Sequence, residues 1–320
     1  MSRSERMSSI DTSWLRMDKP ANLMMITGVI MLEGPLDYDA VEARLARGML
    51  SFPRFRQKVQ SFPTGLFWVE DRGFDISRHI RRARLPDGGG KEALQRYVAE
   101  LAASPLPANH PLWQYTIVED YEGGAAVISR FHHCIADGMA LITVLLSMTD
   151  ATPDGEPAAD LPHEEEDAEE SPFGLFAPVR HALGMGMKLS RRAVKEGMSI
   201  AAEPMKLLNY VRGGLGVAAE LAWLAVMPSD TQTRFKGEPG GDKRVAWTDA
   251  IPLREVKAIS HALGCSVNDV LLTAVAGALR SYLEDRGDAT HGAELRAIVP
   301  VNLRKQGREF ELGNYFGIIA

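Results

Sequence analysis

Phe131-His132-His133-Cys134-Ile135-Ala136-Asp137-Gly138 is the stretch that decides how the rest of this chain is interpreted. The run that leads into it, Ala125–His132, is apolar and typical of a strand, and a helical pattern starts near Gly138. Side chains at such a junction are held by regular structure and are still accessible. The stretch therefore predicts a functional site, with His133 as its central residue.

His133 and Asp137 have the spacing His-x-x-x-Asp. A neutral imidazole has a pKa that suits a general base near pH 7. Asp137 has two open roles: it orients the imidazole as in a triad, or it turns away and fixes the loop through a salt bridge, with Arg304 as a candidate partner. We favour the loop-fixing role, because the loop is short and Gly138 follows. His132 faces the opposite side of the strand and is expected to shape the site.

Other interpretations of this motif stay open. A lone histidine at a strand end is usually a hydrogen-bonded core or surface residue. A metal site would use His132, His133 and Asp137, but no cluster of further ligands lies nearby in the sequence, so no metal is expected. Cys134 as a nucleophile is a further alternative, although a free cysteine is more often a small buried residue.

Composition narrows the class of protein. The chain has 320 residues, 45 % of them hydrophobic and 24 % charged, which is ordinary for a globular protein of one large domain or two. A net charge of −6 gives no basic field for nucleic acid. Two cysteines form no disulfide framework, so a reducing cytosol fits. The polar N-terminus carries no signal-peptide core, and the longest apolar stretch, Gly213–Pro228, is interrupted by Glu220 and too short to span a bilayer comfortably.

Residues 1–152 read as an α/β domain that ends with the motif and its following helix. A helix capped by Asp37 and a second one around Leu94–Leu101 alternate with strand-like runs. Asp120–Gly124 is a plausible hairpin turn between the last two of these runs. The expected strands are Asn22–Glu33, taken as largely buried, Leu66–Val69, Trp113–Glu119 and Ala125–His132.

Residues 153–240 read as an acidic linker and a helical crossover. Pro153–Glu170 holds nine acidic residues and almost no apolar ones, as solvated linkers do. Phe173–Met227 is helical in composition. Its basic, Met-rich part, Met185–Lys195, suits either a lipid surface or packing between two domains, and we favour packing.

Residues 241–320 read as a second α/β unit. Gly264 is expected to stop a helix over Leu253–Leu263. A longer helix follows through Leu283, with an apolar stripe that we expect to be buried. The expected strands are Val245–Trp247 and Leu295–Val301; the stripe comprises Val270, Leu271, Ala274, Val275, Ala278 and Leu279.

Two short stretches carry a structural and a functional interpretation side by side. Pro111-Leu112-Trp113 is a strand entry with an aromatic anchor. Ser266 and Asp269 fit a capping box, which gives Asn268-Asp269 a purely structural explanation. The functional interpretation is that Asn268 faces a substrate.

These stretches, taken in order, resemble the bacterial wax ester synthase/diacylglycerol acyltransferase family, whose active-site motif is HHxxxDG. The resemblance covers essentially the whole chain, and the ordered series is more specific than any single piece. It rests on Ser8–Leu15, Pro111–Trp113, His132–Gly138, Arg244–Trp247, Val267–Val270, Val299–Arg304 and Leu312–Asn314.

The resemblance implies an α/β fold like that of chloramphenicol acetyltransferase, with two similar mixed-sheet domains and the site in a tunnel between them. It implies that His133 is the general base, that a long-chain acyl-CoA is the co-substrate with no permanently bound cofactor, and that the acceptor is a fatty alcohol or a diacylglycerol. The remaining residues that it implicates are His132, Asp137, Gly138, Pro111, Leu112, Trp113, Asn268 and Asp269.

The same resemblance implies a cytoplasmic enzyme, with peripheral attachment to a membrane or a lipid inclusion as an open option. Family members continue past the Gly-Asn landmark, so the second domain is expected to be incomplete at Ala320. Two alternatives are a condensation-type enzyme that forms amide bonds and shares HHxxxDG, and a truncated, non-catalytic lipid-surface protein.

Overall fold

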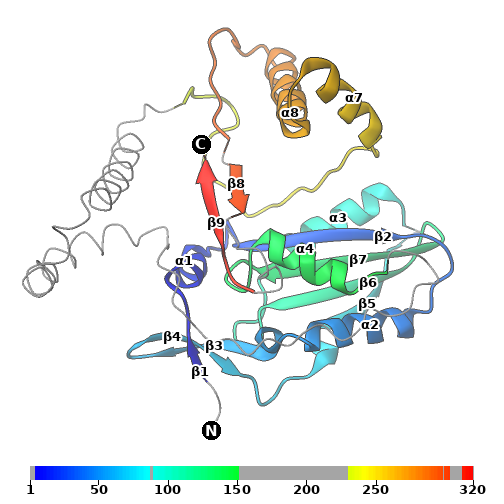
Figure 1. The fold of residues 1–320 in the computed structure, drawn as a ribbon, viewed down its shortest axis with the longest axis vertical. Coiled ribbons are helices and arrows are strands. Elements are labelled where there is room, and N and C mark those ends of the chain that lie inside the picture. The colour runs from blue at the N-terminus through cyan, green and yellow to red at the C-terminus, as the bar shows by residue number, and fades with distance from the viewer. Residues whose placement is uncertain (1–3, 87–88, 151–229, 298, 303–311, 320) are drawn as a thin grey trace, which may run out of the picture. The chain divides into compact units, whose positions relative to one another are not determined.

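The computed structural model describes residues 4–86, 89–150, 230–297, 299–302 and 312–319 (Figure 1). The acidic linker, the helical crossover and Arg304 lie outside these residues. The elements are β1 (Ser4–Arg6), α1 (Ser9–Met17), β2 (Met25–Leu32), α2 (Tyr38–Leu50), η1 (Pro53–Arg56), β3 (Gln57–Phe62), β4 (Gly65–Glu70), η2 (Ile76–Arg78), β5 (Ile80–Arg84), α3 (Lys91–Ala103), β6 (Trp113–Tyr121), β7 (Gly124–His132), α4 (Gly138–Ser147), α7 (Leu253–Leu263), α8 (Val267–Glu284), β8 (Val299–Asn302) and β9 (Phe316–Ile319).

A four-stranded mixed sheet with the order β2-β7-β6-β5 forms the centre of the first unit. The strand pairs β2/β7 and β6/β7 are antiparallel, and β5/β6 is parallel. The predicted hairpin is present. Asp120, at the register shift near the end of β6, and Glu122, in the turn, adopt positive φ angles. Two smaller antiparallel sheets, β1-β4-β3 and β8-β9, complete the strands of the described residues.

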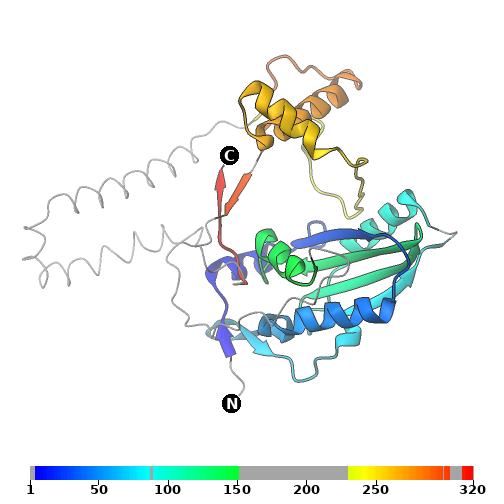
Figure 2. The ribbon, with the colours of Figure 1, turned by 45° about the vertical axis from the view of Figure 1, so that its right-hand side comes forward.

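Helices cover both faces of the central sheet, α3 on one side and α2 with α4 on the other (Figures 1 and 2). Leu45 and Met49 of α2 and Val144 of α4 share one buried cluster with the sheet. Leu94 and Val98 of α3 belong to the cluster on the other face. Because apolar side chains of β6 and β7 alternate between the two clusters, both strands are buried on both faces, which holds the end of β7 rigidly.

The predicted mixed α/β fold is confirmed, with three corrections to its elements. Val245–Trp247 forms no strand among the described residues; Val245 and Trp247 instead pack against the cluster beneath α3. The last predicted strand begins at Val299, and Leu295 is exposed. The segment Asn22–Glu33 gives β2, but its side chains are mostly half-buried because it pairs only with β7, at the edge of the sheet.

The described residues fall into two units. Residues 238–249, 299–302 and 312–319 group with the first unit, and residues 230–237 and 250–297 form the second. The predicted boundaries at residues 152 and 240 stay predictions. In the second unit the apolar stripe of α8 is not buried: Leu271 and Val275 are 46 % and 56 % exposed. Periodicity identifies an apolar face, but among the described residues of this unit little besides α7 packs against α8.

Candidate active site

His133 directly follows the last residue of β7, and its side chain is half-buried. Its backbone N–H donates to the carbonyl oxygen of Met24 at 2.8 Å. The imidazole stacks on the indole of Trp14 in α1, with ring centroids 4.0 Å apart and an interplanar angle of 14°. Stacked rings at this separation attract one another, so Trp14 sets the plane of the imidazole.

Asn314 fixes which imidazole nitrogen of His133 carries the proton. Its Nδ2 donates to Asp11 Oδ1 at 2.8 Å and to the carbonyl oxygen of His133 at 2.9 Å. Since both partners are acceptors, the amide oxygen must face the ring, where Oδ1 lies 3.0 Å from His133 Nδ1. An amide oxygen only accepts, so the network assigns the proton to Nδ1. Nε2 is left with the lone pair that a general base requires.

The start of α1 places both supporting side chains. Ser8 caps the helix by accepting from the backbone N–H of Asp11 at 3.1 Å. Asp11 and Trp14 are three residues apart, so they share one face of the helix and reach Asn314 and His133 respectively. Burial raises the pKa of Asp11 above its ordinary value, whereas the hydrogen bond from Asn314 acts in the opposite direction.

Asp137 holds the loop after His133 by hydrogen bonds to backbone groups. Its Oδ1 accepts from Ala140 N at 2.9 Å and so caps α4, and its Oδ2 accepts from Tyr315 N at 2.9 Å. Its own backbone N–H donates to the carbonyl oxygen of Gly313 at 3.1 Å. These bonds fix the loop and join it to the segment that carries Asn314. Loop fixing is the role we favoured for Asp137, but the salt bridge to Arg304 stays a prediction because Arg304 lies outside the described residues. Gly138, the first residue of α4, is exposed.

His132 is buried, and its Nδ1 accepts from the backbone N–H of Cys134 at 3.1 Å. Burial lowers the pKa of His132 below its ordinary value. Cys134 is fully buried, and burial raises the pKa of its thiol, so it stays protonated at neutral pH. Among the described residues, no group of three or more His, Cys, Asp or Glu is placed to hold a metal ion.

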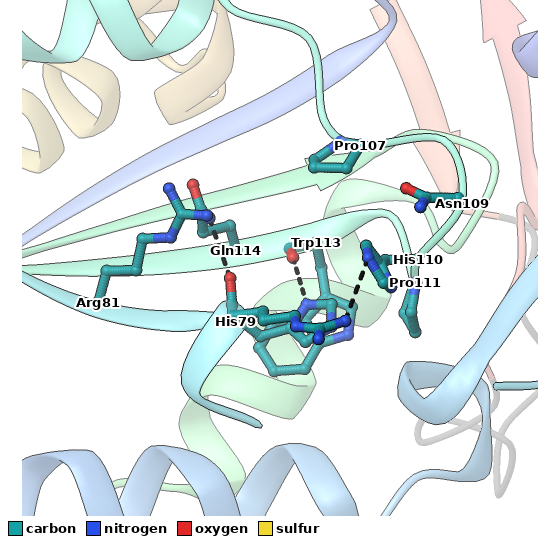
Figure 3. A pocket seen from close by; sticks show the side chains of 9 residues that line it. His79, Arg81, Pro107, Asn109, His110, Pro111, Trp113 and Gln114 are labelled. Carbon is teal, nitrogen blue, oxygen red and sulfur yellow. Dashed lines mark hydrogen bonds between the residues drawn. The ribbon is translucent and has the colours of Figure 1, made fainter. Parts of the chain in front are cut away.

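Pro111-Leu112-Trp113 leads into and begins β6 and supports the motif from the neighbouring strand. The carbonyl oxygen of Leu112 accepts from His132 N at 2.9 Å. Trp113 stacks on His79 with centroids 4.5 Å apart and donates from Nε1 to the carbonyl oxygen of Phe55 at 2.8 Å. A cavity of about 210 Å³ lies beside this segment (Figure 3). It is lined by Arg78, His79, Arg81, Pro107, Asn109, His110, Pro111, Trp113 and Gln114.

Asn268 and Asp269 lie in the second unit, in the first turn of α8. The predicted capping box is present: Asp269 Oδ2 accepts from Ser266 N at 2.9 Å and from Ser266 Oγ at 2.7 Å. This accounts for Asp269 structurally. Asn268 is exposed, and its contact with a substrate stays a prediction.

Asp11, Trp14 and Asn314 were not predicted as site residues. The signal that could have found them is their position within conspicuous stretches at Ser8–Leu15 and Leu312–Asn314. No local pattern shows that these two stretches meet at His133, because Asn314 lies 181 residues further along the chain.

The arrangement brings one imidazole, oriented by Trp14 and Asn314, to the end of a strand in the central sheet. Residues 7–271 match the model of the wax ester synthase/diacylglycerol acyltransferase catalytic domain. The chain belongs to this family.

Relatives of the chain carry related names. A Mycobacterium tuberculosis protein provisionally named as a diacylglycerol O-acyltransferase is 30 % identical over 93 % of this chain and 59 % of its own length. A second protein from that species, with the same provisional activity in its name, is 28 % identical over 93 % of this chain and 62 % of its own length. The chain thus spans about three fifths of the length of these curated relatives.

A solved structure shows the fold. The wax ester synthase/diacylglycerol acyltransferase from Marinobacter aquaeolei VT8 matches with a TM-score of 0.57 at 20 % identity, over 89 % of this chain and 62 % of that one. The match supports the expected family fold.

Proposed function

We propose that this chain provides the catalytic base of an acyl-CoA-dependent O-acyltransferase that makes neutral lipids, either triacylglycerols or wax esters. The observation that carries the proposal is the contact of His133 with Asn314, whose Oδ1 lies 3.0 Å from Nδ1 while its Nδ2 donates to the carbonyl oxygen of His133. This arrangement assigns the proton of the neutral ring to Nδ1 and the lone pair that a base needs to Nε2. Membership of the family supports acyl transfer as the reaction class.

The proposed reaction needs one proton to move twice. Nε2 of His133 takes the proton of the acceptor hydroxyl as that oxygen attacks the thioester carbonyl of acyl-CoA. The tetrahedral intermediate then collapses, the C–S bond breaks, and the imidazolium returns the proton to the departing CoA thiolate. An ester and free CoA result. A positioned base of this kind contributes about 10²–10⁴-fold to a rate.

Direct transfer fits the other side chains of the motif. The reaction requires no covalent acyl-enzyme, and the buried, protonated thiol of Cys134 is unsuited to forming one. Acyl-CoA acts here as a co-substrate. Attachment to a membrane or lipid inclusion and a cytoplasmic location stay predictions. Within the described part of the chain no single helix has the length and apolar character to cross a membrane. Among these residues only the pair α7 and α8, which is bent by 102°, has the length and composition of a membrane span.

The test is the release of free CoA thiol from palmitoyl-CoA, with hexadecanol or a diacylglycerol as acceptor. We expect acceptor-dependent release by the parent chain and a loss of about 10²–10⁴-fold in His133→Ala. His291→Ala, which removes an exposed histidine of the second unit, is the matched control and should retain the activity.

Release that persists in His133→Ala would contradict the assignment of the base. Absence of release by the folded parent, together with flotation on liposomes that His133→Ala retains, would favour the lipid-surface alternative instead. Transfer to an amine but not to a hydroxyl would favour the condensation-type alternative.

A further inference from the structure

The first unit contains an apolar cavity of about 230 Å³ beside His132. Residues from α1, the two sheets and the segment before β6 form its wall. Only three of the lining side chains are polar, Asp18, Ser61 and His132, and the others are Leu15, Leu23, Met25, Val59, Leu66, Pro105, Leu106, Ala108 and Leu112. Such a wall favours an apolar chain over a polar or charged ligand.

His132 lines this cavity and carries a hydrogen-bond donor. Its Nδ1 accepts from Cys134 N, so the proton of the neutral ring is on Nε2. His132 is 4 % exposed, and its Nε2 is buried without a hydrogen-bond partner among the described residues. An unsatisfied buried donor is unfavourable, and a ligand oxygen in the cavity would satisfy it.

Asp18 supplies an acceptor at the same place. Its Oδ1 lies 3.8 Å from His132 Nε2, which is too long for a direct hydrogen bond. The same oxygen is held by Met24 N, which donates to it at 2.7 Å. A ligand oxygen placed to one side of the line that joins His132 Nε2 and Asp18 Oδ1 can lie about 2.8 Å from both atoms. A hydroxyl fits this pair, since it accepts from His132 and donates to Asp18.

We propose that the cavity binds the chain of an apolar alcohol, with its hydroxyl held between His132 Nε2 and Asp18 Oδ1. The carboxylate of Asp18 repels a fatty acid anion, and an ether lacks the proton that Asp18 accepts. His132 is thus a binding residue for a lipid hydroxyl and is distinct from the base at His133. The site does not depend on the proposed reaction, because binding can be measured without acyl-CoA.

The test is equilibrium dialysis of the full chain against three labelled ligands of equal chain length: 1-decanol, decyl methyl ether and decanoate. We expect the parent to bind 1-decanol about tenfold more tightly than either analogue, the ratio that one hydrogen bond to a buried group contributes. His132→Leu should lower the affinity for 1-decanol about tenfold and abolish the preference over the ether.

A second variant keeps the test decisive if His132→Leu fails to fold. Ala108→Phe places a ring in the cavity from an exposed position of its wall, and it should abolish binding of 1-decanol. Ala40→Phe, at an exposed position of α2, is the matched control and should bind as the parent does.

Equal affinity of the parent for the alcohol and the ether, no binding at all, or unchanged binding in Ala108→Phe would overturn the proposal. Binding of 1-decanol by a protein that releases no CoA would sustain this site and count against the proposed function. CoA release without binding of 1-decanol in the cavity would overturn this site and sustain the proposed function.

Discussion

Asn314→Leu tests whether the proposed role of His133 as the base depends on its tautomer. Leucine is close to asparagine in size, but it removes the acceptor that lies 3.0 Å from His133 Nδ1. It also removes the donor to Asp11 and to the carbonyl oxygen of His133. The ring can then carry its proton on either nitrogen, while its stacking on Trp14 is retained.

The expected loss follows from these bonds. Loss of the hydrogen bond that orients the ring costs about 1.5–2.5 kcal/mol of transition-state stabilisation, which lowers kcat/KM roughly 10- to 70-fold. The buried carboxyl of Asp11 also loses a partner, so the free energy of unfolding should fall by ~1–3 kcal/mol. Steady-state CoA release and urea unfolding of the same samples measure the two effects separately.

Asn314→Asp is the informative companion, because it keeps an oxygen acceptor for Nδ1–H and removes the donor to Asp11. We expect it to retain more activity than Asn314→Leu despite lower stability, since a second carboxyl then faces Asp11. A folded Asn314→Leu protein with kcat/KM within twofold of the parent would refute the reasoning.

Three further predictions concern the contacts of His133, the loop that follows it, and two buried histidines. Trp14→Leu removes the stacked ring and should lower kcat/KM about 3- to 10-fold in the CoA-release assay, whereas Trp14→Phe should lose less. Asp137→Ala removes the cap of α4 and the bond to Tyr315 N, so the free energy of unfolding measured in urea should fall by ~1–3 kcal/mol; Asp137→Ser should recover part of it. Burial lowers the pKa of His79 and His132, so the unfolded chain binds more protons and stability should fall as the pH drops below about 6.5. The fall between pH 7.5 and 5.5 should be smaller in His79→Gln; an unchanged fall would show that other groups cause it.

Local chemistry made several elements predictable. Gly264 ends α7 with a φ of 62°, a conformation that glycine adopts without strain, and Ser266 with Asp269 forms the expected capping box. The motif itself was placed correctly between a strand and a helix. In each case the residues that determine the structure are neighbours in the sequence.

Contacts between distant segments were not predictable in the same way. Nothing near His133 shows that Trp14 will stack on it or that Asn314 will bond to it. Val245–Trp247 has the composition of a strand, but its side chains pack without a pairing partner among the described residues. The apolar stripe of α8 was identified correctly as a pattern, but the pattern does not specify what covers it.

The separation between His133 and Asn314 also orders events in time. A ribosome adds about 5–20 residues per second, so the 181 positions between the two residues correspond to about 10–35 s of synthesis. The central sheet and α1 are complete well before Asn314 emerges. During that interval the nascent chain already contains the imidazole of His133, but the partner that orients it has yet to be made, so the proposed base is completed only after the framework around it.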